Sequence, residues 1–96
     1  MYRNQKLLEA VRNAPCMLCS AKNGTIVAAH SNQLRDGKGR GIKASDEFTA
    51  ALCLKCHYEL DQGKNLSKEE RVDMWENAHK RTKAELNRLG LWPEEL

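Results

Sequence analysis

Large aromatic side chains are scarce in this chain of 96 residues, which contains one Phe, two Trp and two Tyr. A domain of this length buries an adequate but small hydrophobic core, and few bulky residues are available to fill it. The sequence also lacks an internal repeat, a low-complexity tract and a linker-like segment. We therefore expect one domain over residues 1–96, stabilised by a cross-link as well as by its core.

Long apolar runs are absent too. The first residues, from Met1 to Lys6, are not followed by an apolar stretch of signal-peptide length. No stretch of the sequence is long and apolar enough to span a membrane. We therefore expect a protein that stays in the reducing cytoplasm and has no membrane partner.

The chain contains four cysteines, and all of them lie in two Cys-x-x-Cys pairs, Cys16 with Cys19 and Cys53 with Cys56. This spacing lets both thiolates of a pair reach one tetrahedral ion. Two disulfides would be the alternative in a secreted chain, but reducing conditions favour metal. Four thiolates suit zinc, with iron as the alternative metal. The sequence predicts one structural Zn²⁺ bound by all four cysteines.

Bulk charge says little about partners. The formal net charge is +3 with the cysteines neutral, and four zinc-bound thiolates with their ion would reduce it to +1. Positive charge is instead concentrated in residues 30–43, where four basic residues outnumber one acidic residue. A cluster of this kind provides phosphate contacts, and the loop glycines allow the backbone to approach closely. The candidate nucleic-acid-binding residues are Arg35, Lys38, Arg40 and Lys43.

Local patterns predict an α+β arrangement. A short helix is expected over residues 2 to 13, then strands over residues 25 to 29 and 48 to 51, and a helix over residues 53 to 61 that ends at Gly63. A capping box at Ser67 predicts a long helix over residues 67–89, whose apolar seam could also mediate self-association. Its members are Val72, Trp75, His79, Thr82, Leu86 and Leu89.

Two histidines lie close to the cysteine pairs. His57 and Asp61 are four residues apart on the expected helix, so their side chains stack one turn from each other and can hold a second divalent ion. His30 ends the first expected strand, and the helix face carrying His57 should turn toward it. For His79, in the middle of the apolar seam, we expect a structural role.

The order of these motifs resembles the HNH endonucleases, which have a ββα-metal fold of treble-clef type. The resemblance covers residues 16–61 and rests on the first knuckle, His30 after a strand, the basic Gly-rich loop and Cys53 to His57. The segments 41–46 and 48–57 are also similar to small nuclease-like proteins of lambdoid prophages.

The resemblance implies that His30 is the general base and that His57 and Asp61 bind the catalytic Mg²⁺, Mn²⁺ or similar ion, with DNA as the partner. It also implies a shallow cleft with a basic rim between His30 and the other two residues. Ala29 stands where many HNH enzymes have a metal ligand, and no clear counterpart of their middle Asn is present; Asp46 or Glu47 could supply a missing group. The alternative interpretation is a zinc-stapled DNA-binding or adaptor module without turnover.

Overall fold

The computed structural model describes residues 2–63 and 65–96 of the chain. It is a small α+β fold with one two-stranded sheet, as the sequence predicts. The described elements are α1 (Gln5–Arg12), β1 (Val27–His30), the 3₁₀ helix η1 (Leu34–Asp36), β2 (Thr49–Leu52), α2 (Leu54–Gln62) and α3 (Lys68–Arg88).

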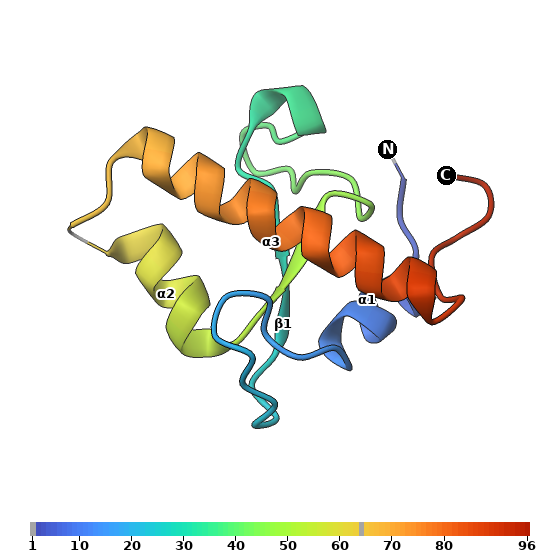
Figure 1. Ribbon diagram of the computed structural model, residues 1–96. Helices are drawn as coiled ribbons and strands as arrows, with labels where there is room; N and C mark the ends of the chain where they lie inside the picture. Colours follow the sequence, from blue (N-terminus) through green and yellow to red (C-terminus); the bar gives the residue numbers. More distant parts are fainter. Residues whose placement is uncertain (1, 64) are drawn as a thin grey trace.

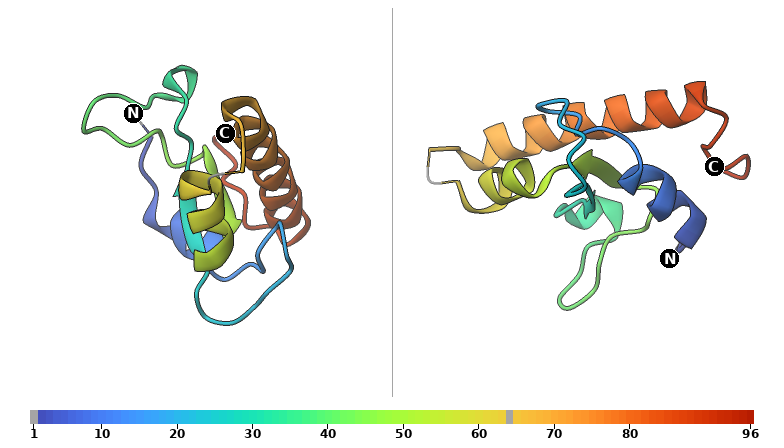
Figure 2. Two further views of the ribbon diagram at one scale, coloured as in Figure 1. Left: turned by 90° about the vertical axis from the view of Figure 1, so that its left-hand side faces the viewer. Right: turned by 90° about the horizontal axis from the view of Figure 1, so that it is seen from below.

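The two strands form an antiparallel hairpin in the middle of the molecule. Val27 lies opposite Leu52, and His30 lies opposite Thr49. All four residues of β2 are buried, because the long helix α3 runs across the hairpin (Figure 1) and α1 and α2 also contact β2. The segment from 37 to 45 projects away from α3 in both views of Figure 2.

The observed element boundaries differ slightly from those expected. The helix expected over residues 2 to 13 is shorter, because the Asn4 side chain accepts a hydrogen bond from the Leu7 amide at 3.0 Å and caps α1. The first strand spans residues 27–30 where 25–29 were expected, and His30 ends it as expected. The second strand is also shifted by one residue and ends at Leu52.

Helix α2 begins and ends at residues with special roles. Cys53 is its N-cap rather than part of its first turn, and its sulfur accepts a hydrogen bond from the Cys56 amide at 3.4 Å. Gly63 is the C-cap, but its φ of −58° is not left-handed. Glycine is required there for space instead, since a Cβ atom would lie 2.3 Å from the Glu59 carbonyl oxygen.

Helix α3 begins and ends at the predicted signals. Ser67 and Glu70 form the capping box, with both reciprocal hydrogen bonds present. At the other end Gly90 has a φ of +72°, and the Leu91 amide donates to the Leu86 carbonyl at 2.8 Å, as in a Schellman motif.

The buried side of α3 is narrower than the predicted seam. Trp75, Thr82 and Leu86 are buried, together with Ala78, which the spacing argument overlooked. Leu89 is 49% exposed, because the helix ends there and the chain turns away.

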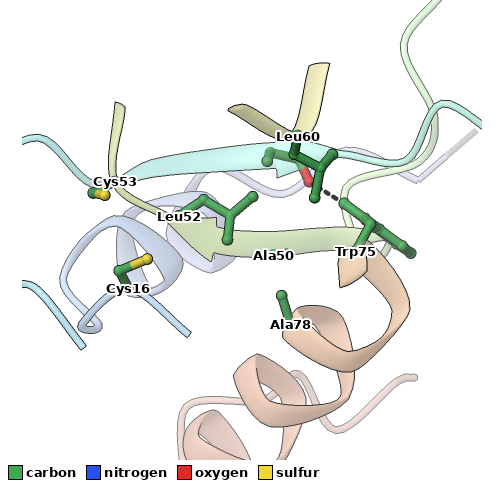
Figure 3. Close-up of a cluster of buried hydrophobic side chains, with 8 residues drawn as sticks. Cys16, Ala50, Leu52, Cys53, Leu60, Trp75 and Ala78 are labelled. Atoms are coloured by element: carbon green, nitrogen blue, oxygen red, sulfur yellow. Dashed lines mark hydrogen bonds between the residues drawn. The ribbon is translucent and has the colours of Figure 1, made fainter. Parts of the chain in front are cut away.

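Hydrogen bonds join the buried side of α3 to both strands. The Trp75 indole donates to the Ala29 carbonyl of β1 at 2.9 Å (Figure 3), and Thr82 Oγ1 accepts from the Ala51 amide of β2 at 3.0 Å. These bonds explain why polar groups occur on an otherwise apolar helix face.

Two apolar clusters form the core, and each contains residues of both α3 and the hairpin. One cluster surrounds Leu52, Leu60 and Trp75 and includes Cys16 and Cys53. The other places Leu7 and Val11 of α1 against Leu86. Among the described residues, no helix combines the length and the apolarity that crossing a membrane requires.

Candidate functional site

The four cysteines lie together at one end of the hairpin. Cys16 and Cys19 come from the knuckle before β1, and Cys53 and Cys56 come from the start of α2; their sulfur atoms all lie within 4.8 Å of one another. The Cys19 and Cys53 sulfurs are 3.7 Å apart. Tetrahedral Zn–S bonds of about 2.3 Å place sulfurs about 3.8 Å apart. The four unpaired cysteines can therefore hold a structural metal such as zinc.

The backbone around the cysteines supports this geometry. The Cys16 amide donates to the Ala21 carbonyl and the Ser20 amide to the Cys16 carbonyl, both at 2.9 Å, which closes the knuckle. Ser20 has a left-handed φ of 65°, which turns the chain back after Cys19. Because β2 leads directly into Cys53, the hairpin sets the position of the second pair relative to the first.

The cysteine thiols differ in their affinity for protons. Burial opposes ionisation of Cys16, but hydrogen bonds from the backbone of Cys53, Cys19 and Leu18 outweigh it and lower its pKa to about 6. Burial, followed by the neighbouring sulfur of Cys53, raises the pKa of the Cys56 thiol. A thiolate is thus favoured at the buried centre of the cluster, and a cation bound there would balance its charge.

His30 is held by a buried carboxylate. Its Nε2 atom lies 2.8 Å from Oδ1 of Asp46, a residue that is only 2% exposed. Of the two acidic residues that could supply a missing group to the HNH pattern, it is Asp46 rather than Glu47 that contacts the histidine. The His30 side chain is 17% exposed, so its ring remains within reach of solvent.

The N-terminal segment holds Asp46 in place. Oδ2 of Asp46 accepts from the Asn4 amide at 2.7 Å, and Oδ1 accepts from Arg3 Nη1 at 3.1 Å. The Arg3 guanidinium also donates to the carbonyls of Lys43 and Ala44. Sequence reasoning did not identify Arg3, because no local pattern links residues that lie more than forty positions apart.

The hydrogen bonds to Asp46 determine its charge state. Burial alone would raise its pKa, but the hydrogen bonds from His30, the Asn4 amide and Arg3 hold it below its ordinary value. Asp46 is therefore ionised at neutral pH and acts only as an acceptor. It follows that His30 Nε2 is the donor in this bond, which in the neutral tautomer leaves the lone pair on Nδ1.

His57 and Asp61 lie side by side on α2, as their spacing predicts. His57 Nε2 is 3.1 Å from Asp61 Oδ2, and the Asn32 amide is 3.5 Å from Asp61 Oδ1. Asn32 lies two residues after His30, so the end of β1 approaches this face of α2. Within the described residues, however, the cysteines form the only group of three or more His, Cys, Asp or Glu side chains that could hold a metal.

Three of the four basic residues of the predicted DNA-binding loop lie on one segment, and the fourth lies on η1. Arg40 and Lys43 are exposed on the segment that projects away from α3 (Figure 2), and Lys38 on the same segment is half-buried. Arg35, on η1, instead forms an ion pair with Glu76 of α3.

His79 is a structural residue. Its Nδ1 atom lies 2.8 Å from the Thr49 carbonyl, and its ring stacks on Trp75 with centroids 5.0 Å apart. The ring thus packs between α3 and β2.

A pocket of about 440 Å³ includes Asn32 in its lining, and the Asn32 amide lies 3.5 Å from Asp61 Oδ1. The pocket is formed by the segment around η1, by α2 and by the first half of α3. Of the predicted site residues, only Arg35 contributes to its lining. The complete lining is Asn32, Gln33, Leu34, Arg35, Leu60, Lys68, Arg71, Val72 and Trp75.

No family model, no curated protein and no solved structure matches this chain. The function is therefore inferred from the arrangement of the side chains and from the order of the sequence motifs.

Proposed function

We propose that this chain is a metal-dependent endonuclease of the HNH type, which hydrolyses DNA phosphodiester bonds with His30 as the general base. The observation that carries the proposal is the 2.8 Å contact between His30 Nε2 and the buried Asp46. A base that is oriented by a carboxylate is the arrangement that activates water in hydrolytic enzymes.

The proton transfer uses the nitrogen that Asp46 leaves available. Among the described residues, His30 forms its side-chain hydrogen bond through Nε2, and none is found at Nδ1. A water molecule at Nδ1 gives up a proton as its oxygen attacks phosphorus, and the bond from phosphorus to the 3′-oxygen breaks. The ionised Asp46 stabilises the imidazolium that forms, and the leaving oxygen takes up a proton from solvent.

His57 and Asp61 are the proposed ligands of the catalytic ion, which would be Mg²⁺, Mn²⁺ or a similar cation. The His57 nitrogen and the Asp61 oxygen are 3.1 Å apart, so a small movement of either side chain would let both atoms contact one ion. The bound ion would neutralise charge on the scissile phosphate and on the leaving oxygen. The four-cysteine centre is assigned to structural Zn²⁺ and keeps α2 attached to the hairpin.

The test is cleavage of plasmid, single-stranded and branched DNA with Mg²⁺, Mn²⁺, Ni²⁺ or Zn²⁺ supplied separately. His30→Gln is the most informative variant, because the glutamine amide nitrogen can replace Nε2 in the bond to Asp46 but cannot accept a proton. We expect its cleavage rate to fall by about 10²–10⁴-fold, which is the usual contribution of a general base.

The matched control is His79→Asn, which keeps a donor near the Thr49 carbonyl and changes a histidine outside the proposed site. It should cleave at the parent rate once circular dichroism shows that it is folded. Equal rates for the parent and the His30→Gln variant would remove His30 as the base.

The second candidate function is a zinc-stapled DNA-binding or adaptor module without turnover. It is favoured by the fact that His57 and Asp61 satisfy each other, with no third His, Cys, Asp or Glu ligand found among the described residues. This function predicts DNA affinity without strand scission in any metal. Replacing Lys38, Arg40 and Lys43 by Gln would then make the plot of log binding constant against log salt concentration less steep, by up to about three units of slope for duplex DNA.

A further inference from the structure

We propose that the pocket between η1, α2 and α3 binds one unstacked nucleobase of the DNA strand that the enzyme acts on. This inference rests on the proposed function, because it assigns a substrate feature to the neighbourhood of that site. The volume of the pocket, about 440 Å³, is within the range of sites that enclose small organic groups.

The walls of the pocket suit the faces of a base. Leu34, Leu60, Val72 and Trp75 contribute apolar side chains from three separate elements. Leu34 is 81% exposed, although a leucine gains nothing from contact with water. A flat aromatic ligand that packed against Leu34 would remove this surface from solvent.

The polar groups of the pocket suit the edge of a base. Asn32 and Gln33 lie side by side in the lining and carry amide groups, which can both donate to and accept from a nucleobase. Gln33 also donates to Glu76 at 2.9 Å and accepts from Arg35 at 2.9 Å, so its position is fixed. The exposed Asn32 has only the long 3.5 Å contact to Asp61 among the described residues.

The rim of the pocket suits the phosphate that accompanies a base. The lining of the pocket includes three basic residues, Arg35, Lys68 and Arg71. Arg71 is occupied by the carbonyls of Leu60, Gly63 and Leu66, and Arg35 is paired with Glu76. Lys68 is exposed and has no ion-pair partner in the described part of the chain, which makes it the phosphate contact.

Asn32 connects the pocket to the proposed catalytic centre. It lines the pocket, approaches Asp61 at 3.5 Å and follows His30 by two residues. A strand whose scissile phosphate lies between His30 and His57 could therefore place a neighbouring base in the pocket. The enzyme would then prefer single-stranded, bulged or branched DNA, in which bases are already unstacked.

The experiment measures the binding of two single-stranded oligonucleotides to the His30→Gln variant, so that the probe stays intact. One probe carries 2-aminopurine at its centre, and the other carries an abasic residue there and is otherwise identical. We expect the abasic probe to bind about tenfold more weakly, as loss of one stacked base predicts. The aminopurine fluorescence should also change on binding.

Three variants locate the site. Leu34→Ser should weaken the intact probe by severalfold and leave the abasic probe unchanged, whereas Leu96→Ser, a similar loss at an exposed leucine elsewhere, should affect neither. Lys68→Gln should weaken both probes equally and reduce the single-strand salt slope by about 0.7. The proposal would be overturned if the His30→Gln protein bound the two probes with equal affinity. It would also be overturned if adding Leu34→Ser weakened the binding of both probes equally.

The outcome is separable from that of the proposed hydrolysis. Base-dependent binding without cleavage of any DNA would retain the pocket and remove the nuclease assignment. If the parent cleaves DNA but the intact and abasic probes bind equally, the nuclease assignment stands and the nucleobase pocket is removed.

Discussion

Asp46 connects three parts of the molecule through a single carboxylate. The N-terminal residues Arg3 and Asn4 donate to it from one side, and His30 contacts it from the other. A buried acceptor with three partners keeps its charge only while these partners remain in place. Ionisation of Asp46 therefore depends on the positions of the N-terminal segment and of His30.

The depressed pKa of Asp46 predicts a pH-dependent loss of stability. A carboxyl whose folded pKa lies below its unfolded value of about 3.9 contributes stability above that value, and this contribution is lost as the pH falls through the folded pKa. Asp46→Asn should lower the free energy of unfolding by about 1–3 kcal/mol at pH 7. The difference from the parent should shrink as the pH falls below 4.

Urea titrations at several pH values would measure this difference. Glu47→Gln is the control, since it changes the neighbouring acidic residue and should shift stability by less than about 0.5 kcal/mol. An Asp46→Asn variant that unfolded at the same urea concentration as the parent at pH 7 would contradict the assignment of an ionised, bonded Asp46. In a cleavage assay, Asp46→Asn should also slow turnover, because a neutral amide stabilises the imidazolium less well.

Helix α2 is the element that joins the cysteine centre to the proposed catalytic pair. Cys53 and Cys56 lie at its start, His57 and Asp61 follow on the next turns, and Gly63 ends it. Arg71 of α3 then donates to the Leu60 and Gly63 carbonyls, which holds the helix end against α3. The orientation of His57 thus depends on both ends of a nine-residue helix.

Gly63→Ala should destabilise the fold by about 1–3 kcal/mol, as insertion of a methyl group into a closely packed site does. The added Cβ would lie 2.3 Å from the Glu59 carbonyl oxygen, and that oxygen belongs to rigid helix backbone. Gly39→Ala is the matched control, because its Cβ would meet Ile42 at an ordinary 3.7 Å. Thermal unfolding of both variants would test this prediction. If Gly63→Ala and Gly39→Ala had equal melting temperatures, the close contact at the end of α2 would be contradicted.

At the scale of the whole molecule, the cysteine centre replaces part of a hydrophobic core. Cys16 and Cys53 belong to the same buried cluster as Leu52 and Trp75, so the candidate metal site and the apolar packing are one unit. The other cluster, around Leu7 and Leu86, does not include a cysteine. We therefore expect the packing around α1 to depend less directly on a metal bound by the cysteines.

Removal of the metal by a chelator should abolish the cooperative thermal transition, because metal binding at such sites contributes to folding directly. Cys19→Ser should have a similar effect although Cys19 is exposed, since its role is ligation rather than burial. Adding Zn²⁺ back should restore the parent but not the variant. An unchanged melting temperature after chelation would show that the packing alone is sufficient.

The parts of the structure that the sequence predicted depend on local spacing. The Cys-x-x-Cys pairs, the capping box at Ser67 and the pairing of His57 with Asp61 all join residues within one turn or helix. The bond between His30 and Asp46 spans 16 positions across an irregular segment, and no periodic pattern identifies it. The pocket requires three elements that are distant in sequence, so only the folded arrangement reveals it.

The position of Tyr2 has a practical consequence for producing the protein. Its hydroxyl donates to Glu95 at 2.7 Å, and its backbone carbonyl accepts from the Asp46 amide at 2.9 Å, so both chain ends lie near the carboxylate that holds His30 (Figure 1). An affinity tag at either end would emerge beside this contact. Cleavable tags are therefore the suitable choice, with activity measured after their removal.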